Sequence, residues 1–303
     1  MANRMRIGHL LGHLRPCISF EFFPPKTDEG VEKLMATVRS LRALNPGFVS
    51  VTYGAGGSSR ARTVEVTKRI KAELAVEAMA HVTCVGHSQD ELRALFGELS
   101  AAGIENIMAL RGDPPAGQES FVAADGGFRY ASDLIAMLAA EFSFSIGAAG
   151  YPETHPEATS FDADIENAVR KVRSGAEFLV TQLFFDNDQY FAYVKHLRDG
   201  GVTVPVIPGI MPITNYESIA RMTKMSGARI PQRLLSELEL RKDEPEAVAE
   251  LGVAFAALQC RDLLARGAPG LHFYTLNRSP ATRAVVSALT ATLDLRADVV
   301  ALT

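Results

Sequence analysis

The run Ile18-Ser19-Phe20-Glu21-Phe22-Phe23 is followed at once by Pro24-Pro25. A continuous apolar run that ends at a turn signal is typical of an inner strand of a parallel sheet with both faces covered. Glu21 lies near the end of this strand among phenylalanines. Because burial disfavours the charged carboxylate, we expect a raised pKa for Glu21 and a role as a general acid. The alternative is a structural glutamate that pairs with an Arg or Lys.

Similar apolar runs recur along the chain and predict the fold. Amphipathic segments separate them, and this alternation indicates βαβ units and a parallel sheet. Eight such units in 303 residues fit an α/β TIM (β/α)8 barrel of a single domain better than a doubly wound sheet. The predicted strands are Cys17–Phe23, Phe48–Tyr53, Ala78–Val85, Asn106–Leu110, Phe144–Ala149, Phe178–Phe185, Val204–Ile210 and Leu271–Leu276.

Helical patterns fill the intervals between these strands. Ser88 and Asp90 supply an N-cap signal for one helix and Asn215 for another. The gap from Ile210 to Leu271 has room for two helices or more. We expect residues 1–16 to be an N-terminal extension and residues 279–303 to be a C-terminal helix. The predicted helices are Gly30–Leu44, Ala61–Leu74, Gln89–Ala102, Ala131–Glu141, Ala163–Ser174, Asn187–Leu197 and Asn215–Met225.

The composition is that of a globular protein with a large core. The chain is 47% hydrophobic and 22% charged, with a formal net charge of −4. It has no basic patch that would neutralise nucleic-acid phosphates, no apolar run of the roughly 18 residues that a bilayer span needs, and no signal-peptide pattern. Cys17, Cys84 and Cys260 are far apart and indicate reduced core thiols. We therefore expect a cytoplasmic protein without nucleic-acid or membrane partners.

Polar and glycine-rich residues follow the predicted strands. In a TIM barrel the active site lies at the C-terminal ends of the strands, so these residues should converge there. An alignment of this kind along the whole chain supports a site more strongly than any single motif. The residues are Glu21, Thr52–Ser58, His87, Arg111–Pro115, Tyr151–Pro156, Thr181-Gln182, Pro208–Pro212 and Asn277-Arg278.

The segment His81–His87 does not favour a metal site. Side chains alternate across a strand, so His81 and His87 should share one face while Cys84 points away. Two imidazoles without a carboxylate or thiolate make a poor zinc site, and we expect no metal. A hydrogen bond from His81 to a ligand is the better interpretation.

Glycine-rich and charged turns indicate a ligand site but do not identify the ligand. Gly54–Ser59 lacks the full dinucleotide and P-loop fingerprints, so it is either a tight turn or a close approach of backbone to a ligand. In Arg111-Gly112-Asp113 the arginine suits a pyrophosphate or an electron-rich ring edge, and a structural Arg–Asp pair is the alternative. Asp164 and Lys171 share one helical face and can equally be solvated or functional.

No nucleophile elbow, Cys/His pair or strand-end lysine accompanies the buried acid. An acid without a nucleophile implies that a cofactor carries the difficult chemistry. Seven motifs together resemble the bacterial methylenetetrahydrofolate reductases, in the family's order and from Ile18 to Arg278. They are Ser19–Pro25, Val51–Ser58, Ala109–Asp113, Tyr130–Leu134, Gly150–Ala158, Thr181–Asp186 and His272–Arg278.

The resemblance implies that residues 1–303 form a single flavin-binding barrel. Such an enzyme reduces 5,10-methylenetetrahydrofolate to 5-methyltetrahydrofolate with NAD(P)H, by a ping-pong mechanism through non-covalent FAD. The resemblance makes Glu21 the general acid and Asp113 the carboxylate that tunes flavin and pterin, both catalytic. It assigns FAD binding to Thr52, Tyr53, Ala55, His81, Arg111, Gly112, Asp113, Tyr130, Ala131, Tyr151, His155, Ala158, Asp164, Asn167, Arg170 and Lys171.

The resemblance also assigns substrate binding to Thr52, Asp113, Gln182, Ser218, Met222 and Arg278. Gln182 would serve both folate and nicotinamide, and Met222 stands where an aromatic residue is expected. We further expect a homo-oligomer, whereas a preference for NADH or NADPH does not follow from the sequence.

Two other functions are compatible with the residues. One is a pterin-binding barrel that transfers a one-carbon group without flavin, which a bound yellow chromophore would exclude. The other is a non-enzymatic carrier of folate or flavin. Glu21, Asp113 and Gln182 argue against a carrier, because a protein that only binds has no need of a buried acid.

Overall fold

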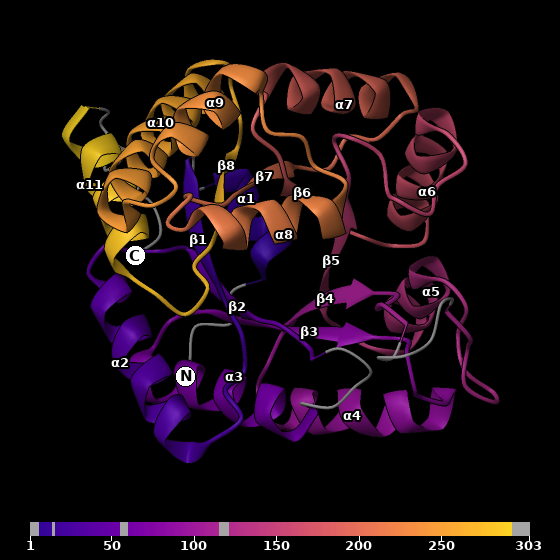
Figure 1. Ribbon diagram of the computed structural model, residues 1–303. Helices are drawn as coiled ribbons and strands as arrows, with labels where there is room; N and C mark the ends of the chain where they lie inside the picture. The colour runs from indigo at the N-terminus through magenta and orange to yellow at the C-terminus, as the bar shows by residue number, and fades with distance from the viewer. Residues whose placement is uncertain (1–5, 14–15, 55–59, 115–120, 293–303) are drawn as a thin grey trace.

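Eight parallel strands form a closed barrel (Figure 1). The computed structural model describes residues 6–13, 16–54, 60–114 and 121–292. Each strand pairs with the next in the chain, and the last strand pairs with the first. The predicted TIM barrel is therefore confirmed. The strands are β1 (Cys17–Phe22), β2 (Phe48–Val51), β3 (Ala78–Thr83), β4 (Asn106–Leu110), β5 (Ser145–Gly150), β6 (Phe178–Leu183), β7 (Val206–Ile210) and β8 (Gly270–Tyr274).

Helices surround the barrel, and their caps follow the sequence signals. Ser88 forms a capping box with Glu91, and the Asn215 side chain accepts a hydrogen bond from the Ser218 amide. The long interval after β7 contains three helices. The helices are α1 (Ile7–His13), α2 (Asp28–Arg42), α3 (Arg60–Leu74), α4 (Gln89–Ala101), α5 (Ala131–Glu141), α6 (Phe161–Arg173), α7 (Asn187–Asp199), α8 (Tyr216–Ser226), α9 (Gln232–Leu240), α10 (Pro245–Ala265) and α11 (Pro280–Thr292).

Several strands end one or two residues earlier than predicted. β3 ends at Thr83, and the chain then turns, with the His87 amide donating to the Cys84 carbonyl and Gly86 at a positive φ of 74°. The expectation that His81 and His87 share a strand face is therefore wrong, because His87 lies beyond the strand. The C-terminal helix ends at Thr292 among the described residues, and residues 293–303 lie outside them.

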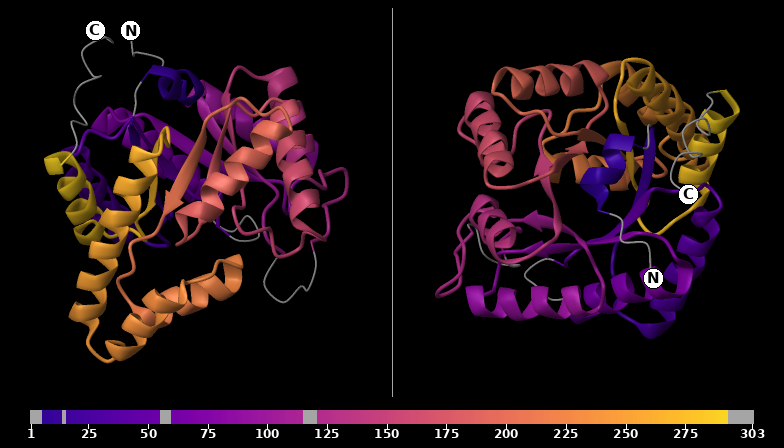
Figure 2. Two further views of the ribbon diagram at one scale, coloured as in Figure 1. Left: turned by 90° about the horizontal axis from the view of Figure 1, so that it is seen from above. Right: turned by 180° about the vertical axis from the view of Figure 1, so that it is seen from behind.

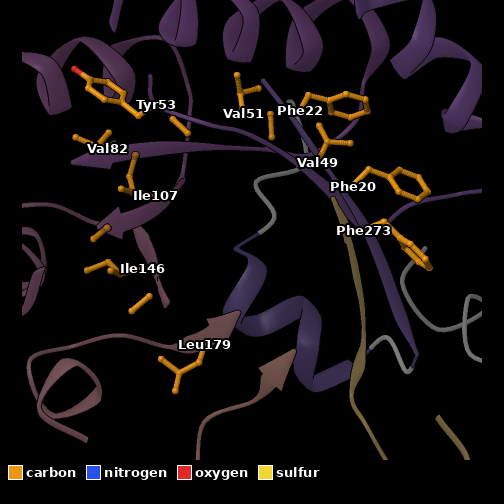
Figure 3. Close-up of a cluster of buried hydrophobic side chains, with 14 of the residues drawn as sticks. Phe20, Phe22, Val49, Val51, Tyr53, Val82, Ile107, Ile146, Leu179 and Phe273 are labelled. Carbon is orange, nitrogen blue, oxygen red and sulfur yellow. The ribbon is translucent and has the colours of Figure 1, made fainter. Parts of the chain in front are cut away.

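The main core lies between the barrel and its helices. Side chains that point outward from the strands pack there, and Phe20, Phe22, Val49 and Phe273 are examples (Figure 3). The alternation along each strand turns the intervening residues into the barrel. In β1 this places Ser19 and Glu21 inside, while Phe20 and Phe22 face the helices.

Helix α1 closes the N-terminal end of the barrel, which the sequence did not predict. Ile7 and Leu11 are fully buried and pack in one cluster with Phe48 and Phe178. The Ile7 amide donates to Asn106 Oδ1 at 2.8 Å. Figure 2 shows α1 on the side of the barrel opposite to α8. None of the described helices has the length and apolar character that crossing a membrane requires.

We predict that Leu11→Ala lowers the free energy of unfolding by about 2–5 kcal/mol, because it removes a buried side chain from the barrel floor. Urea denaturation followed by circular dichroism measures this change. Gly12→Ala is the control on the same helix, since an added Cβ meets nothing within 4 Å there. That control should be neutral or stabilising by up to about 1 kcal/mol. Equal midpoints for Leu11→Ala and the unchanged protein would show that α1 does not close the floor.

Candidate active site at the C-terminal end of the barrel

Glu21 lies inside the barrel, at the centre of a buried polar cluster. Its Oε2 lies 3.3 Å from His272 Nε2 and 3.4 Å from His81 Nε2, and it accepts a hydrogen bond from the Ser50 hydroxyl at 3.4 Å. Strand register explains the cluster, because Glu21 is opposite Ser50 on β2 and opposite Tyr274 on β8. The Glu21 side chain is only 9% exposed. Among the described residues the two histidines are the basic side chains that lie next to it, so the alternative of an Arg or Lys pair is not the arrangement found.

The protonation of this cluster differs from the expectation. Burial raises the pKa of Glu21, but the charge of His81, the hydrogen bond and charge of His272, and the hydrogen bond from Ser50 together lower it below its ordinary value. The expected raised pKa of Glu21 is therefore wrong. Burial lowers the pKa of His81 to about 4, although Glu21 opposes that shift. His81 is thus neutral near pH 7. At that pH, His272 and Ser50 are the groups that hydrogen-bond to the Glu21 carboxylate.

His272 is oriented from both sides of its ring. Its Nδ1 lies 2.8 Å from Ser19 Oγ, and its Nε2 faces Glu21. Ser19, His272 and Glu21 all point into the barrel from the adjacent strands β1 and β8. His272 begins the motif His272–Arg278, from which no role for it was predicted. Its position opposite Ser19 in the register is the signal that identifies it.

The end of β1 is held by the segment that follows β8. The Thr275 hydroxyl donates to the Glu21 carbonyl at 2.6 Å. The Asn277 side chain accepts from the Phe23 amide and donates to the Phe23 carbonyl, each at 2.8 Å. Leu276 and Asn277 adopt left-handed φ angles of 51° and 59°. Strain of this kind in non-glycine residues is concentrated at functional sites.

Arg111 lies at the rim and pairs with Glu157. Its two terminal nitrogens donate to the Glu157 carboxylate at 2.6 and 2.7 Å. The suggested Arg111–Asp113 pair is therefore not the one that forms, and Asp113 is exposed. Gly112 has a φ of 89°, and a Cβ there would lie 2.8 Å from Val85 Cγ1. Only glycine lets the backbone of this turn pack so closely on the end of β3.

The segment after β5 forms a second side of the site. The Asp164 carboxylate accepts from the His155 amide at 2.9 Å, and Lys171 Nζ donates to the Ala149 carbonyl at 2.9 Å. Tyr151 and His155 pack edge to face, with ring centroids 4.6 Å apart. Burial lowers the pKa of Lys171, Asp164 raises it and Arg111 lowers it. Asp164 is buried and the Lys171 ammonium bonds inward, so the solvated alternative for this pair is wrong.

Other predicted residues lie in varied settings. The Tyr53 hydroxyl lies 2.9 Å from His87 Nε2, and its ring packs in the outer core (Figure 3). Tyr53 can therefore reach the barrel mouth through its backbone but not through its ring. Ala55 falls outside the described residues. Thr52 is buried at the end of β2, Tyr130 and Ala131 begin α5, Ala158 is half-buried before α6, and Asn167, Arg170 and Arg278 are exposed.

The substrate-side residues Ser218 and Met222 lie on α8, which crosses the C-terminal end of the barrel (Figures 1 and 2). Both are half-buried. Gln182 lines a small crevice with Tyr151, Ser226 and Ala228, so its strand meets the end of α8. The sequence did not predict that α8 would reach the segment after β5.

Two buried polar atoms at the end of β3 have no hydrogen-bond partner within the described part of the chain. They are His81 Nε2 and Thr83 Oγ1. Buried polar atoms are normally satisfied, so these two indicate a polar ligand. The cations Arg111 and Lys171 lie on the β4–β5 side of the barrel. Together with these two polar atoms they fit a flavin dinucleotide, which has phosphates and hydrogen-bonding ring edges. No group of three or more potential metal ligands was found among the described residues.

Comparison with known proteins identifies the family of the chain. Residues 6–290 match the family described as methylenetetrahydrofolate reductase. The chain is 40% identical over 283 residues to methylenetetrahydrofolate reductase (NADH) 1 of Zea mays, covering 90% of this chain and 48% of that protein. It is 36% identical over 300 residues to the 5,10-methylenetetrahydrofolate reductase of Pectobacterium carotovorum, covering 98% of this chain and 96% of that one. The chain thus spans about half the length of the plant relative and nearly all of the bacterial one.

A solved structure shares the fold. It is an uncharacterised protein from Clostridium thermocellum that binds two copies of 5-methyl-5,6,7,8-tetrahydrofolic acid, with a TM-score of 0.63 and 15% sequence identity. The alignment covers 95% of this chain and 99% of that one. At this identity the likeness supports the barrel alone. The family match over residues 6–290 and the sequence relatives place the chain in the methylenetetrahydrofolate reductase family.

Proposed function

We propose that this chain reduces 5,10-methylenetetrahydrofolate to 5-methyltetrahydrofolate, with NAD(P)H as the electron donor and FAD as the cofactor. The observation that carries the proposal is the buried Glu21 carboxylate at the C-terminal end of the barrel, held by His272 and Ser50. Burying an acid is costly, and here no Arg or Lys among the described residues pairs with it to make it a structural ion pair. The activity of the bacterial relative, which the chain matches over nearly its whole length, is consistent with this chemistry.

The flavin, when bound, would accept a hydride from the nicotinamide and pass it to the folate, so the two substrates would use one site in turn. Arg111 and Lys171 supply cations, and the Gly112 turn offers backbone that a ligand can approach closely. His81 Nε2 and Thr83 Oγ1 supply unsatisfied polar atoms. Tyr151, His155 and Asp164 form a connected group after β5. Asp113, exposed at the rim, would be the charge that tunes both ring systems.

Glu21 would deliver a proton to the nitrogen that leaves when the folate five-membered ring opens. The carboxyl must then carry a proton that its surroundings disfavour, since they lower its pKa. His272 Nε2, at 3.3 Å, is near enough to exchange a proton with it. Gln182, Ser218, Met222 and Arg278 would bind substrate around this centre. We also propose that the protein is cytoplasmic and forms a homo-oligomer.

A barrel that transfers one-carbon groups without flavin is the competing function. It would need neither the cationic side at Arg111 and Lys171 nor the unsatisfied atoms at the end of β3. The presence of both on one side of the mouth favours a dinucleotide. Metal-independent activity follows from the same proposal and stays a prediction.

We predict that the protein binds FAD without a covalent bond and that Lys171→Met weakens this binding about 10- to 100-fold. That range is expected when a hydrogen bond to a charged group is lost. Titration of flavin-free protein, followed by quenching of FAD fluorescence, measures the Kd. Lys195→Met is the control, because Lys195 pairs with Asp199 on the outer helix α7 and should not change the Kd. A protein that is purified without flavin and does not take up FAD would refute the reductase proposal.

We predict that Glu21→Gln separates the two half-reactions. Flavin reduction by NADH needs no proton from Glu21 and should keep its rate, whereas reoxidation by methylenetetrahydrofolate should slow by about 10²–10⁴-fold. Stopped-flow absorbance of the flavin follows each half-reaction separately. Glu77→Gln is the matched control, since Glu77 is also a buried carboxylate but precedes β3 at the opposite end of the barrel, where it pairs with Lys71. Equal slowing of both half-reactions by Glu21→Gln would instead make Glu21 a structural or binding residue.

A further inference from the structure

Glu153, in the segment between β5 and α6, is a buried carboxylate with partners from one distant segment. Its two oxygens lie 3.2 Å from the backbone amide of Arg229, which donates to them. Arg229 Nε donates to Oε2 at 3.1 Å. The Glu153 side chain is 7% exposed, whereas the Arg229 side chain is 78% exposed. The carboxylate is thus buried, but the guanidinium that reaches it is in solvent.

The backbone amide is the more important of these partners. An ion pair with an exposed guanidinium contributes little, because water screens the charge and the long side chain must be ordered. A buried carboxylate, by contrast, needs donors to offset its loss of hydration. The Arg229 amide supplies such a donor at a fixed point of the backbone. Glu153 therefore fixes the position of the chain at residue 229, largely independently of the side chain there.

This contact joins two segments to which the proposed function assigns different ligands. Tyr151 and His155 flank Glu153 and belong to the proposed flavin side. Arg229 follows α8, which carries Ser218 and Met222 on the proposed folate side. The α8 C-cap Gly227, at φ 76°, lies against the same segment, since a Cβ there would be 3.4 Å from Pro156 Cγ.

Helix α8 also packs on an apolar cluster, in which Ile219 is buried with Leu183 and Ile213 and against which Tyr216 and Met222 pack. Ile219 is its one fully buried residue among those described, and Met225 near its end is 74% exposed. The helix is capped at its start by Asn215. Its far end is held by the contact of residues 227–229 with the segment that contains Glu153. Loss of that contact would remove the polar contact that orients the end of α8 over the mouth and leave apolar packing, such as that of the buried Ala228, to hold it.

We propose that Glu153 is a positioning residue that sets α8, and with it Ser218 and Met222, relative to the flavin segment and Gln182. Tyr151, Glu153, Gln182 and Ala228 line one crevice, so the contact and the proposed folate residue Gln182 are neighbours. This inference rests on the proposed reductase function. It assigns Glu153 no contact with substrate and no proton transfer.

The experiment compares Glu153→Ala, Glu153→Gln and Arg229→Ala in the full chain loaded with FAD. For Glu153→Ala we expect the apparent KM for methylenetetrahydrofolate to rise about tenfold or more, the scale for loss of a charged hydrogen bond. The maximal rate of flavin reoxidation and the Kd for FAD should change by less than about twofold. Glu153→Gln keeps one acceptor oxygen and should be intermediate. Arg229→Ala keeps the backbone amide and should have the smallest effect.

Glu141→Ala is the control, because it removes a carboxylate that pairs with Arg93 between the outer helices α4 and α5. It should change neither KM nor the FAD Kd. Glu153→Gln keeps the test decisive if the alanine variant does not fold. An unchanged folate KM in both Glu153 variants would overturn the proposal, and so would an FAD Kd that rises as much as the KM. A wild-type protein that neither binds FAD nor reduces the folate would instead refute the reductase function, and this inference with it.

Discussion

The pairing of β8 with β1 closes the barrel, and the surroundings of Glu21 depend on it. Ser19 lies opposite His272 and Glu21 opposite Tyr274 because these two strands are parallel and in this register. Residues 23–269 separate the end of β1 from the start of β8. Strand β8, the last in the chain, therefore supplies His272 to the Glu21 cluster, so the cluster requires the closed barrel.

Two kinds of constraint keep this cluster in place. Hydrogen bonds within it satisfy the buried polar groups, and Thr275 and Asn277 hold the backbone of β1 where the strand ends. Both are needed, since a carboxylate can act on a substrate atom only if its own position is defined to within a fraction of an ångström. The left-handed residues Leu276 and Asn277 cost some stability, which the packed barrel supplies.

The sequence predicted the barrel and the end at which its polar residues gather, because continuous apolar runs and their alternation with amphipathic segments can be recognised locally in the chain. It placed Glu21 correctly in a buried strand but missed the sign of its pKa shift, since His81 and His272 approach it only after the barrel closes. The Arg111 partner was missed for the same reason, as Glu157 lies 46 positions away. Helix α1 is too short for its apolar residues to show a clear period, and its fit in the barrel floor depends on side chains from several strands.

Because α1 fills the floor of the barrel, it affects when Glu21 can receive a proton relative to the binding of the folate. Ile7, Leu10 and Leu11 pack beneath the barrel, and the first amides of α1 donate to Asn106 and Ser145, so α1 covers the floor. A proton bound for Glu21 would then enter from the mouth, which is the end that a bound folate covers. On the proposed function, Glu21 has to be protonated before the folate binds. Each folate that binds can then be protonated only by a proton that the cluster already holds.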